Sequence, residues 1–242
     1  MESLMSPQLK TLKINESESL SLYEQVLFQN GQEGFRIWEA GIVIARYIYH
    51  NKQQFEGKSI LELGSGTGIG GLSALKFAQA QKLIFSDYTQ EVLDGIAKNL
   101  KLLENDQSLK KSQIYECHLV DWTKEETHHS IMQLKDNDEE SSLDFIIATD
   151  VIYQGSPYPQ LAQLLHKLLN QYKNCQALII IPDQRMCKED FLEKMKELGF
   201  KWEVEELNEG KYLCKALDND KESDKYYPGL TRLTFKLYKF SL

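Results

Sequence analysis

Residues 58–71, with the sequence KSILELGSGTGIGG, constrain the fold of this chain more than any other stretch. Ile60, Leu61 and Leu63 form a short apolar run that is typical of a buried strand. The glycines that follow end the strand and allow a sharp turn, and apolar residues then recur at helical spacing from Ile69 onward. Because glycine has no Cβ and a helix N-terminus offers free N–H groups, this segment predicts a nucleotide-type binding loop.

The spacing of these glycines narrows the kind of ligand. The dinucleotide fingerprint needs glycine at its first, third and sixth positions, but Ile69 occupies the sixth position here. The glycines recur instead as Gly64, Gly66 and Gly68, and Glu62 lies two residues before the first of them. This acidic-x-Gly-x-Gly-x-Gly pattern resembles motif I of the seven-strand, S-adenosylmethionine-dependent methyltransferases. An acidic residue suits a ligand with a sulfonium, an ammonium and no phosphate, whereas a glycine turn without any ligand is the alternative interpretation.

Apolar strands and amphipathic helices alternate along the rest of the chain. The predicted strands cover residues 60–63, 82–86, 112–120, 143–149, 177–181, 200–207 and 230–240. The predicted helices cover residues 35–49, 69–80, 89–103, 157–169 and 191–198. The last two strands follow each other without a helix, so we expect a mostly parallel sheet with one antiparallel strand at the end. Together with motif I, this order predicts an α/β fold that resembles the Rossmann-like seven-stranded methyltransferase sheet, with helices on both faces.

Three segments fall outside this alternation. Residues 1–34 are predicted to form an N-terminal arm with one or two short strands, and residues 35–242 are predicted to form the methyltransferase domain. Residues 123–142 are polar and acidic, which favours a solvated loop with room for a short helix. Residues 210–229 form a charged segment that interrupts the predicted order of strands and helices.

Polar side chains follow several of the predicted strands at their carboxyl ends, where open parallel sheets bind ligands. These strand ends carry Gly64, Asp87, Asp121 with Trp122, and Thr149 with Asp150. Asp87 lies about 20 residues past the glycines, where βαβ nucleotide folds place an acidic residue on the ribose hydroxyls. The same position also suits the start of the helix over residues 89–103, which is the alternative for Asp87. We expect these strand ends to converge on one crevice.

Three further segments narrow the family. The segments are Ile37-Trp38-Glu39-Ala40-Gly41, Leu119-Val120-Asp121-Trp122 and Asp150-Val151-Ile152-Tyr153. They resemble the Trp-Asp/Glu-Ala segment, the Leu-x-Asp-Trp segment and the Asp-x-x-Tyr post-motif of the methyltransferase-like protein-lysine methyltransferases. This family includes relatives of the chaperone, valosin-containing-protein and elongation-factor lysine methyltransferases. The resemblance covers about residues 35–207.

The resemblance implies a set of contacts with S-adenosylmethionine. The residues implied to bind this cofactor are Trp38, Gly64, Ser65, Gly66, Asp87, Trp122 and Thr149. We expect Trp122 to pack a flat face on adenine while Asp121 accepts a hydrogen bond from the exocyclic amine. The alternative for both Trp38 and Trp122 is that the indole is simply a core residue. Glu62 is expected to face the methionyl end of the cofactor or to orient the loop.

Asp150 and Tyr153 are implied to lie at the transfer site. A lysine amine, with an ordinary pKa of about 10.4, must lose its proton before it can attack the methyl group. Our hypothesis is that Tyr153 and Asp150 orient the incoming ε-amine, and the alternative for Asp150 is a structural role in its loop. Because this displacement needs little acid–base chemistry, positioning should supply most of the rate.

Composition limits the partners and the location. The net charge of −8 argues against a nucleic-acid binder and mildly favours a basic acceptor such as a lysine-bearing protein. We find neither a membrane-length apolar stretch nor a signal-peptide pattern, and we expect no membrane partner. The four cysteines are scattered, without zinc-site spacing, so we expect reduced thiols and no metal. We therefore expect a cytoplasmic monomer, with a nuclear location also open.

Several functions remain open at this point. The motifs do not separate a protein-lysine from a protein-histidine methyltransferase. A small-molecule methyltransferase would need a lid, for which residues 1–34 offer little, and intact site motifs argue against a non-catalytic, cofactor-binding adaptor. A dehydrogenase is disfavoured by Ile69 at the third glycine position of the fingerprint.

Overall fold

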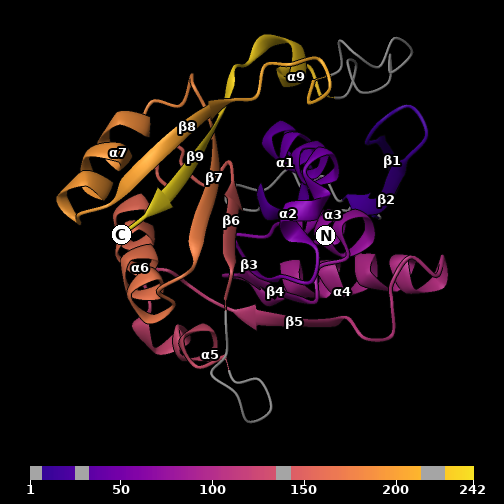
Figure 1. Ribbon diagram of the computed structural model, residues 1–242, viewed down its shortest axis with the longest axis horizontal. Coiled ribbons are helices and arrows are strands. Elements are labelled where there is room, and N and C mark those ends of the chain that lie inside the picture. The colour runs from indigo at the N-terminus through magenta and orange to yellow at the C-terminus, as the bar shows by residue number, and fades with distance from the viewer. Residues whose placement is uncertain (1–6, 25–32, 135–142, 214–226) are drawn as a thin grey trace, which may run out of the picture.

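The computed structural model describes residues 7–24, 33–134, 143–213 and 227–242. A seven-stranded sheet runs through the centre in the order β5-β4-β3-β6-β7-β9-β8 (Figure 1). The parallel strands are β3 (Ser59–Leu63), β4 (Lys82–Asp87), β5 (Ile114–Leu119), β6 (Phe145–Thr149) and β7 (Gln176–Pro182). The last strand, β9 (Phe235–Ser241), runs antiparallel to both β7 and β8 (Lys201–Glu206). The predicted α/β class and the single antiparallel strand are confirmed.

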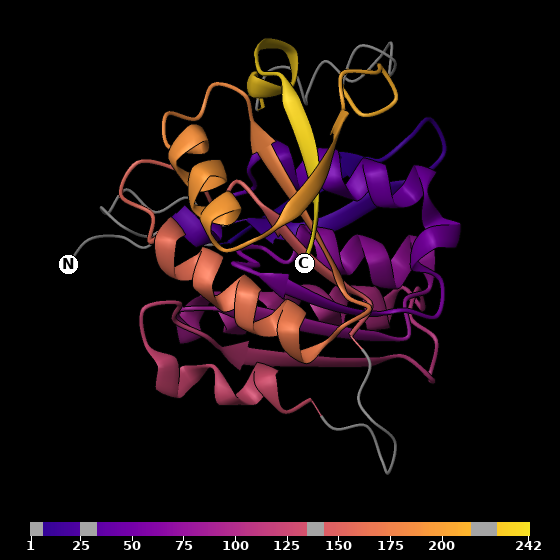
Figure 2. The ribbon, with the colours of Figure 1, turned by 60° about the vertical axis from the view of Figure 1, so that its left-hand side comes forward.

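Helices cover both faces of this sheet. One face carries α1 (Glu39–His50), α2 (Lys52–Phe55), α3 (Ile69–Ala78) and α4 (Gln90–Asn105). The other face carries α5 (His129–Met132), α6 (Tyr158–Gln171) and α7 (Lys188–Glu197). Figure 2 brings this second side forward and shows α6 and α7 lying over the strands. Shorter helical turns are η1 (Glu33–Phe35), η2 (Glu125–Thr127) and α9 (Gly229–Arg232). In the described residues no helix combines the length and the apolar character that crossing a bilayer requires.

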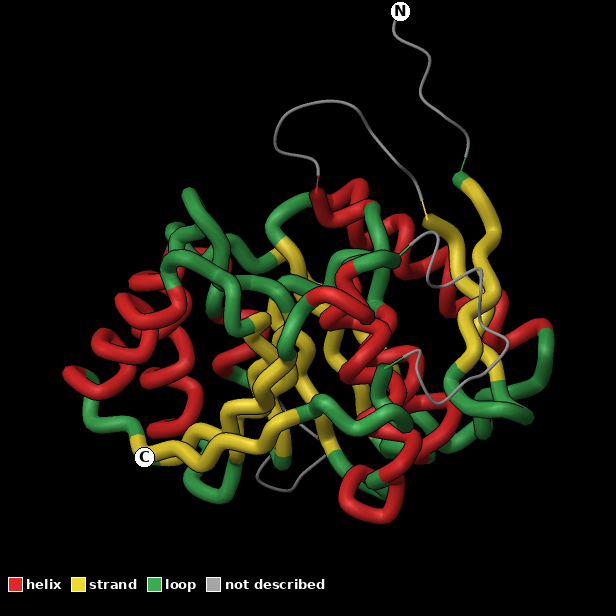
Figure 3. Tube along the Cα trace, turned by 90° about the horizontal axis from the view of Figure 1, so that it is seen from above, coloured by secondary structure: helices red, strands yellow, loops and turns green. Residues whose placement is uncertain are grey.

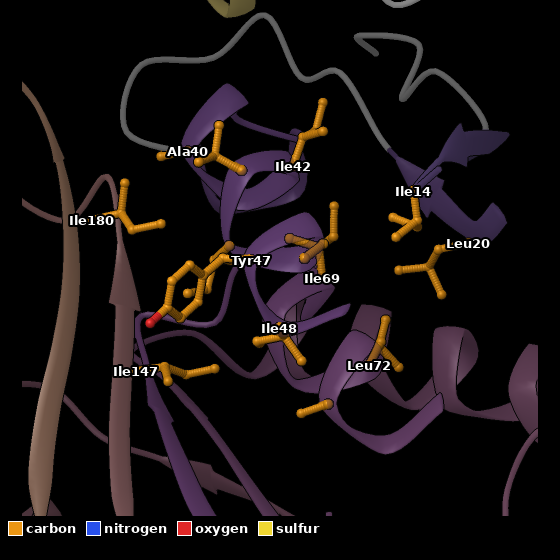
Figure 4. Packing of buried hydrophobic residues seen from close by; sticks show 14 of the residues in the cluster. Ile14, Leu20, Ala40, Ile42, Tyr47, Ile48, Ile69, Leu72, Ile147 and Ile180 are labelled. Carbon is orange, nitrogen blue, oxygen red and sulfur yellow. The ribbon is translucent and has the colours of Figure 1, made fainter. Parts of the chain in front are cut away.

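The strands divide the core into two apolar clusters because successive side chains point to opposite faces of a sheet. In β3, Ile60 joins the cluster under α1 and α3, whereas Leu61 and Leu63 join the cluster under α6. Figure 4 shows the first cluster, in which Tyr47 of α1 lies near Ile147 of β6. Both faces of the central strands are therefore buried, which explains their almost continuous apolar sequences.

The N-terminal residues form a two-stranded hairpin of β1 (Gln8–Lys13) and β2 (Ser19–Glu24), as the sequence suggested for the arm. Figure 3 shows this hairpin at the far end of the molecule from the C-terminus. Leu12, Leu20 and Leu22 are fully or almost fully buried and join the cluster of α1 and α3. The division of the chain at residue 34 into an arm and a domain stays a prediction.

One expectation needs correction. The last strand was expected over residues 230–240, but Leu230 lies in α9 and β9 begins only at Phe235. Within the expected solvated segment, most of residues 123–134 are exposed and α5 is the short helix that was left open, although Ile131 packs into the core under α6 and His128 is buried. Of the two loop segments, residues 135–142 and 214–226 lie outside the described residues.

Candidate active site

The glycine loop turns through left-handed backbone conformations. The φ angles of Gly64, Gly66 and Gly68 are +64°, +53° and +78°, which side chains other than glycine rarely adopt. A Cβ on Gly64 would lie 3.0 Å from a methyl group of Val151 and 3.2 Å from the Trp122 ring. A Cβ on Gly66 would lie 3.1 Å from the Gly34 carbonyl oxygen. Bare backbone is therefore required where these neighbours close around the loop.

Ser65 fastens the loop to the neighbouring strand. Its N–H donates to the carbonyl of Ser86 at 2.9 Å, and its hydroxyl oxygen accepts from the N–H of Ser86 at 3.0 Å. Both serine hydroxyls also donate to the carbonyl of Glu62, at 3.0 and 2.8 Å. The buried Ser65 side chain is therefore engaged in holding the loop in place.

Glu62 lies beneath the loop and faces the start of α3. Its carboxylate accepts from the N–H of Gly71 at 3.2 Å. Burial raises the pKa of Glu62 to about 8, although hydrogen bonds from the Gly71 and Gly70 N–H groups oppose the shift. A Cβ on Gly70 would lie only 2.4 Å from this carboxylate. This arrangement favours the loop-orienting role for Glu62.

Close packing of α3 on the sheet depends on glycines that the dinucleotide fingerprint does not contain. A Cβ on Gly71 would lie 2.3 Å from the Phe85 ring of β4. In the fingerprint, the third glycine allows the helix to pack closely on the sheet. Gly70 and Gly71 take this role here, one and two residues after the position of that third glycine. Ile69 at the sixth position is therefore compatible with close helix packing.

Asp87 closes the other side of the glycine loop. Its carboxylate accepts from the N–H of Gly66 at 3.0 Å and from that of Tyr88 at 2.8 Å. Burial raises the pKa of Asp87, and these backbone hydrogen bonds partly offset the shift. The Asp87 carbonyl accepts from the N–H of Val120 at 2.8 Å, which brings the end of β5 to the same place.

Trp122 lies against the loop, as the ring contact at Gly64 requires. Asp121 turns back on its own loop, where its carboxylate accepts from the Thr123 hydroxyl at 2.7 Å and lies 2.9 Å from the Lys124 ammonium. Burial raises the pKa of Asp121, but the Thr123 and Lys124 hydrogen bonds outweigh it and hold that pKa below its ordinary value. His128 Nε2 lies 3.0 Å from the Asp121 carbonyl oxygen. Thr123 and Lys124 therefore already occupy part of the Asp121 carboxylate.

The turn after β6 also borders the glycine loop, because a Cβ on Gly64 would lie 3.0 Å from Val151 in this turn. Thr149 ends this strand, and Asp150 follows with a left-handed φ of +55°, its N–H donating to the Ile180 carbonyl at 3.2 Å. Tyr153 has 37% of its surface exposed. The Ser156 hydroxyl accepts from the Tyr153 N–H at 3.1 Å, which closes the turn.

Arg185 is a site residue that the sequence analysis missed. It follows β7, and its guanidinium donates to both carboxylate oxygens of Asp150, from Nε at 2.7 Å and from Nη2 at 2.5 Å. The same guanidinium carbon lies 6.0 Å from the centre of the Trp38 ring. Strand-end reasoning alone would have found it, because β7 ends at Pro182 on the same edge of the sheet as β6.

The start of α1 lies beside the glycine loop. Trp38 precedes the first turn of α1, and its ring also faces the Arg36 guanidinium at 5.0 Å. One turn into the helix, a Cβ on Gly41 would lie 2.7 Å from Ile69, the first residue of α3. Residues 34–41 therefore pass over Gly66 and along the start of α3.

A small cavity of about 40 Å³ borders the loop on the hairpin side. Its lining includes Tyr23, Phe35, Gly66, Val92 and Asn99, and does not include Trp122 or Asp87. This cavity is therefore distinct from the contacts that Asp87 and Trp122 make with Gly66 and Gly64.

The described residues contain no cluster of histidine, cysteine, aspartate and glutamate that could hold a metal ion. Cys117, Cys175 and Cys187 are free thiols, and Cys214 lies outside the described residues. Burial raises the pKa of Cys175 to about 12, which makes this thiol a weak nucleophile, whereas Cys117 is exposed.

Comparison with known proteins identifies the family. A family model described as lysine methyltransferase matches residues 14–198, a range that includes every candidate site residue discussed above. The chain belongs to the lysine methyltransferase family. Solved structures that resemble this family member include a SAM-dependent methyltransferase from Aquifex aeolicus, with a TM-score of 0.52 and 13% identity over 84% of this chain and 93% of that one. The structure of SMU.776 complexed with SAH has a TM-score of 0.58 and 13% identity, and covers 100% of this chain and 58% of that one. These two structures confirm the fold.

Curated relatives of this lysine methyltransferase family member carry different acceptor names. The protein-lysine N-methyltransferase EFM3 of Chaetomium thermophilum is 26% identical over 82% of this chain and 56% of its own length. The calmodulin-lysine N-methyltransferase of Arabidopsis thaliana is 25% identical over 67% and 49%. The histidine protein methyltransferase 1 homolog of Bos taurus is 28% identical over 67% and 47%. The chain thus spans about half the length of these curated relatives.

Proposed function

We propose that this chain is an S-adenosylmethionine-dependent protein methyltransferase whose acceptor is a lysine ε-amine. The observation that carries the proposal is the meeting of Gly66 with Asp87 at 3.0 Å and of Gly64 with the Trp122 ring, all at the carboxyl ends of adjacent parallel strands. Membership of the lysine methyltransferase family supports the same activity.

The residues present fit this cofactor. The left-handed Gly64 and Gly66 let the loop turn tightly against Val151, Trp122 and Gly34, where a side chain would collide. The Asp87 carboxylate can accept from both ribose hydroxyls, and the flat Trp122 ring can pack on adenine. When bound, the cofactor would supply a sulfonium-bound methyl group, whose carbon a neutral amine attacks in line while the thioether S-adenosylhomocysteine leaves.

The acceptor is proposed to enter beside the turn after β6. Tyr153 is the most exposed member of the Asp-x-x-Tyr segment, with 37% of its surface exposed, and we assign its side chain to the rim that the acceptor approaches. Thr149 and Asp150 lie deeper in the same turn. We assign Thr149 to the cofactor side and Asp150 to the support of the transfer site. These residues contribute mainly by positioning the acceptor. No proton needs to be removed in the transfer itself, because the attacking amine must already be neutral.

A histidine acceptor is the second candidate. One of the relatives is named a histidine protein methyltransferase homolog, whereas several others are named protein-lysine N-methyltransferases. The larger number of lysine names and the lysine family model favour lysine. A small-molecule acceptor receives no such support from these names.

We further propose that the chain acts as a monomer in the cytoplasm, on a protein and without nucleic acid or membrane partners. The net charge of −8 supports the absence of a nucleic-acid partner, because backbone phosphates attract basic surfaces. The free thiols of the described residues are consistent with a reducing compartment.

Two measurements test the activity. Thermal unfolding is followed with S-adenosylhomocysteine and, separately, with NAD. Only S-adenosylhomocysteine is expected to raise the melting temperature, and a response to NAD alone would overturn the proposal.

Cell extract is then incubated with tritiated S-adenosylmethionine and either the wild-type chain or a Gly66→Ala variant. Label is expected in a protein only with the wild type, and hydrolysis of that protein should yield methyllysine. Methylhistidine would establish the second candidate, and cofactor binding without any labelled protein would favour the adaptor.

A further inference from the structure

The Asp150 carboxylate is already occupied by the protein's own arginine. Both of its oxygens accept from Arg185, in the two-pronged geometry that gives the strongest carboxylate–guanidinium pairing. Only 5% of the Asp150 side chain is exposed, against 29% of the Arg185 side chain. The member of the pair that faces outward is therefore the guanidinium.

Arg185 is itself held firmly. The turn that carries it begins at Asp183, whose carboxylate lies 2.6 Å from the Lys188 ammonium and 2.9 Å from that of Lys236. The Asp183 N–H also donates to the Thr234 carbonyl at 2.8 Å. Because both ends of the ion pair are anchored to neighbouring strands, an incoming ammonium would have to break a largely buried pair to reach Asp150, which is costly.

The ion pair also connects segments that are distant in the sequence. Arg185 reaches the Trp38 ring at the start of α1, while Asp150 begins the turn that leads to Tyr153. Asp150 adopts a left-handed backbone conformation, which aspartate tolerates better than most residues. Fixing its side chain therefore also fixes the direction in which that turn continues.

We propose that Arg185 is a positioning residue of the acceptor site and that Asp150 acts through Arg185, without touching the acceptor amine. This inference rests on the proposed function and deepens it. The ion pair holds the Trp38 ring and the Tyr153 turn at a fixed separation, and the acceptor side chain enters between them. Arg185 carries only N–H donors, so its outer edge can contact carbonyl oxygens of the acceptor protein.

A double-mutant cycle tests this proposal. Asp150→Asn, Arg185→Gln and the double variant are compared for label transfer into the protein that the wild type labels in cell extract. Each single change is expected to lower kcat by a similar factor, on the order of 10- to 100-fold, and the double variant should lose no more than either single one. Arg185→Lys should share most of this loss, because an ammonium cannot donate the two parallel hydrogen bonds that the guanidinium makes to the Asp150 carboxylate. Near-normal activity of Arg185→Gln or Arg185→Lys, or losses that multiply in the double variant, would overturn the proposal.

A spectroscopic readout avoids any need for the acceptor. The indole N–H resonance of Trp38, assigned with Trp38→Phe, should move in both single variants, while those of Trp122 and Trp202 stay in place. An unmoved Trp38 resonance would contradict the link through Arg185. The double variant, which leaves no unpaired buried charge, provides a folded comparison if either single variant is unstable.

Two controls separate this inference from the proposed function. Lys167→Gln removes an exposed ion pair with Glu125, whose charged atoms are 2.7 Å apart, and should leave transfer and the Trp38 resonance unchanged. The affinity for S-adenosylhomocysteine is measured in the Asp150 and Arg185 variants, so that their rates of label transfer are compared at saturating cofactor. A wild-type chain that binds no S-adenosylhomocysteine would instead overturn the proposed function, with the Trp38 resonance still reporting on the ion pair.

Discussion

The backbone N–H of Gly66 donates to the Asp87 carboxylate at 3.0 Å, which joins the turn after β3 to the end of β4. The two residues are 21 positions apart, and α3 lies between them. One oxygen of this buried carboxylate binds the loop and the other binds the next N–H of its own chain, at Tyr88. Asp87 therefore holds the glycine turn in the shape that its proposed contact with a ribose would need.

Gly66→Ala is expected to abolish binding of S-adenosylhomocysteine. The left-handed φ of +53° costs an alanine about 1–2 kcal/mol, and its Cβ would in addition press on the Gly34 carbonyl oxygen at 3.1 Å. Isothermal titration measures the loss. Gly57→Ala is the matched control, because Gly57 has a similar φ of +70° with no atom within 4 Å of its Cβ position. Equal loss of affinity in both variants would show that the effect is general strain.

Trp122→Leu is expected to weaken binding of S-adenosylhomocysteine by about 1–3 kcal/mol, the usual range for removing an aromatic ring from under a base. Tryptophan fluorescence is expected to change when S-adenosylhomocysteine binds, and the substitution should remove the contribution of Trp122 to that change. Trp202→Leu serves as the control, because Trp202 packs on Phe240, with ring centres 5.7 Å apart, at the other end of the sheet. Unchanged affinity in Trp122→Leu would mean that this indole is a core residue.

Glu62→Gln is expected to make the protein less sensitive to rising pH. Burial raises the pKa of Glu62 from its ordinary value of 4.5 to about 8 in the folded chain. The folded protein then retains a proton that the unfolded chain has lost, so stability falls by about 1.4 kcal/mol per pH unit between these two values. Urea unfolding at pH 6, 7 and 8 should show a shallower decline for the variant. Parallel curves for the two proteins would contradict the raised pKa.

Asn99→Ala is expected to loosen the N-terminal hairpin. The buried Asn99 side chain accepts from the N–H of Tyr23 in β2 at 2.6 Å and donates to the carbonyl of Thr67 in the glycine loop at 3.0 Å. Leaving these groups without partners should cost about 1–3 kcal/mol of unfolding free energy. Hydrogen exchange at the Tyr23 amide should accelerate more than exchange within β6. Unchanged exchange at Tyr23 would favour a hairpin held by its leucines alone.

Much of the fold was predictable because it depends on local patterns. Apolar runs of strand length and amphipathic repeats predicted the strands and main helices of the sheet domain. The helix predicted over residues 191–198 ends before Gly199, whose left-handed φ of +87° is typical of a glycine that follows a helix. The short α2 lies where no helix was predicted, and α9 replaced the start of the last strand. Patterns of four residues are too short to specify a helix, so tertiary contacts decide them.

The sequence alone determined which residues end the parallel strands, and thereby that Gly64, Asp87 and Trp122 share one edge of the sheet. This follows from covalent order, because each strand is followed directly by its own turn. Only the tertiary structure decided which side chains bind each other across that edge. It paired Asp150 with Arg185 and turned Asp121 back onto Thr123, because such pairings depend on distances between turns that no spacing along the chain records.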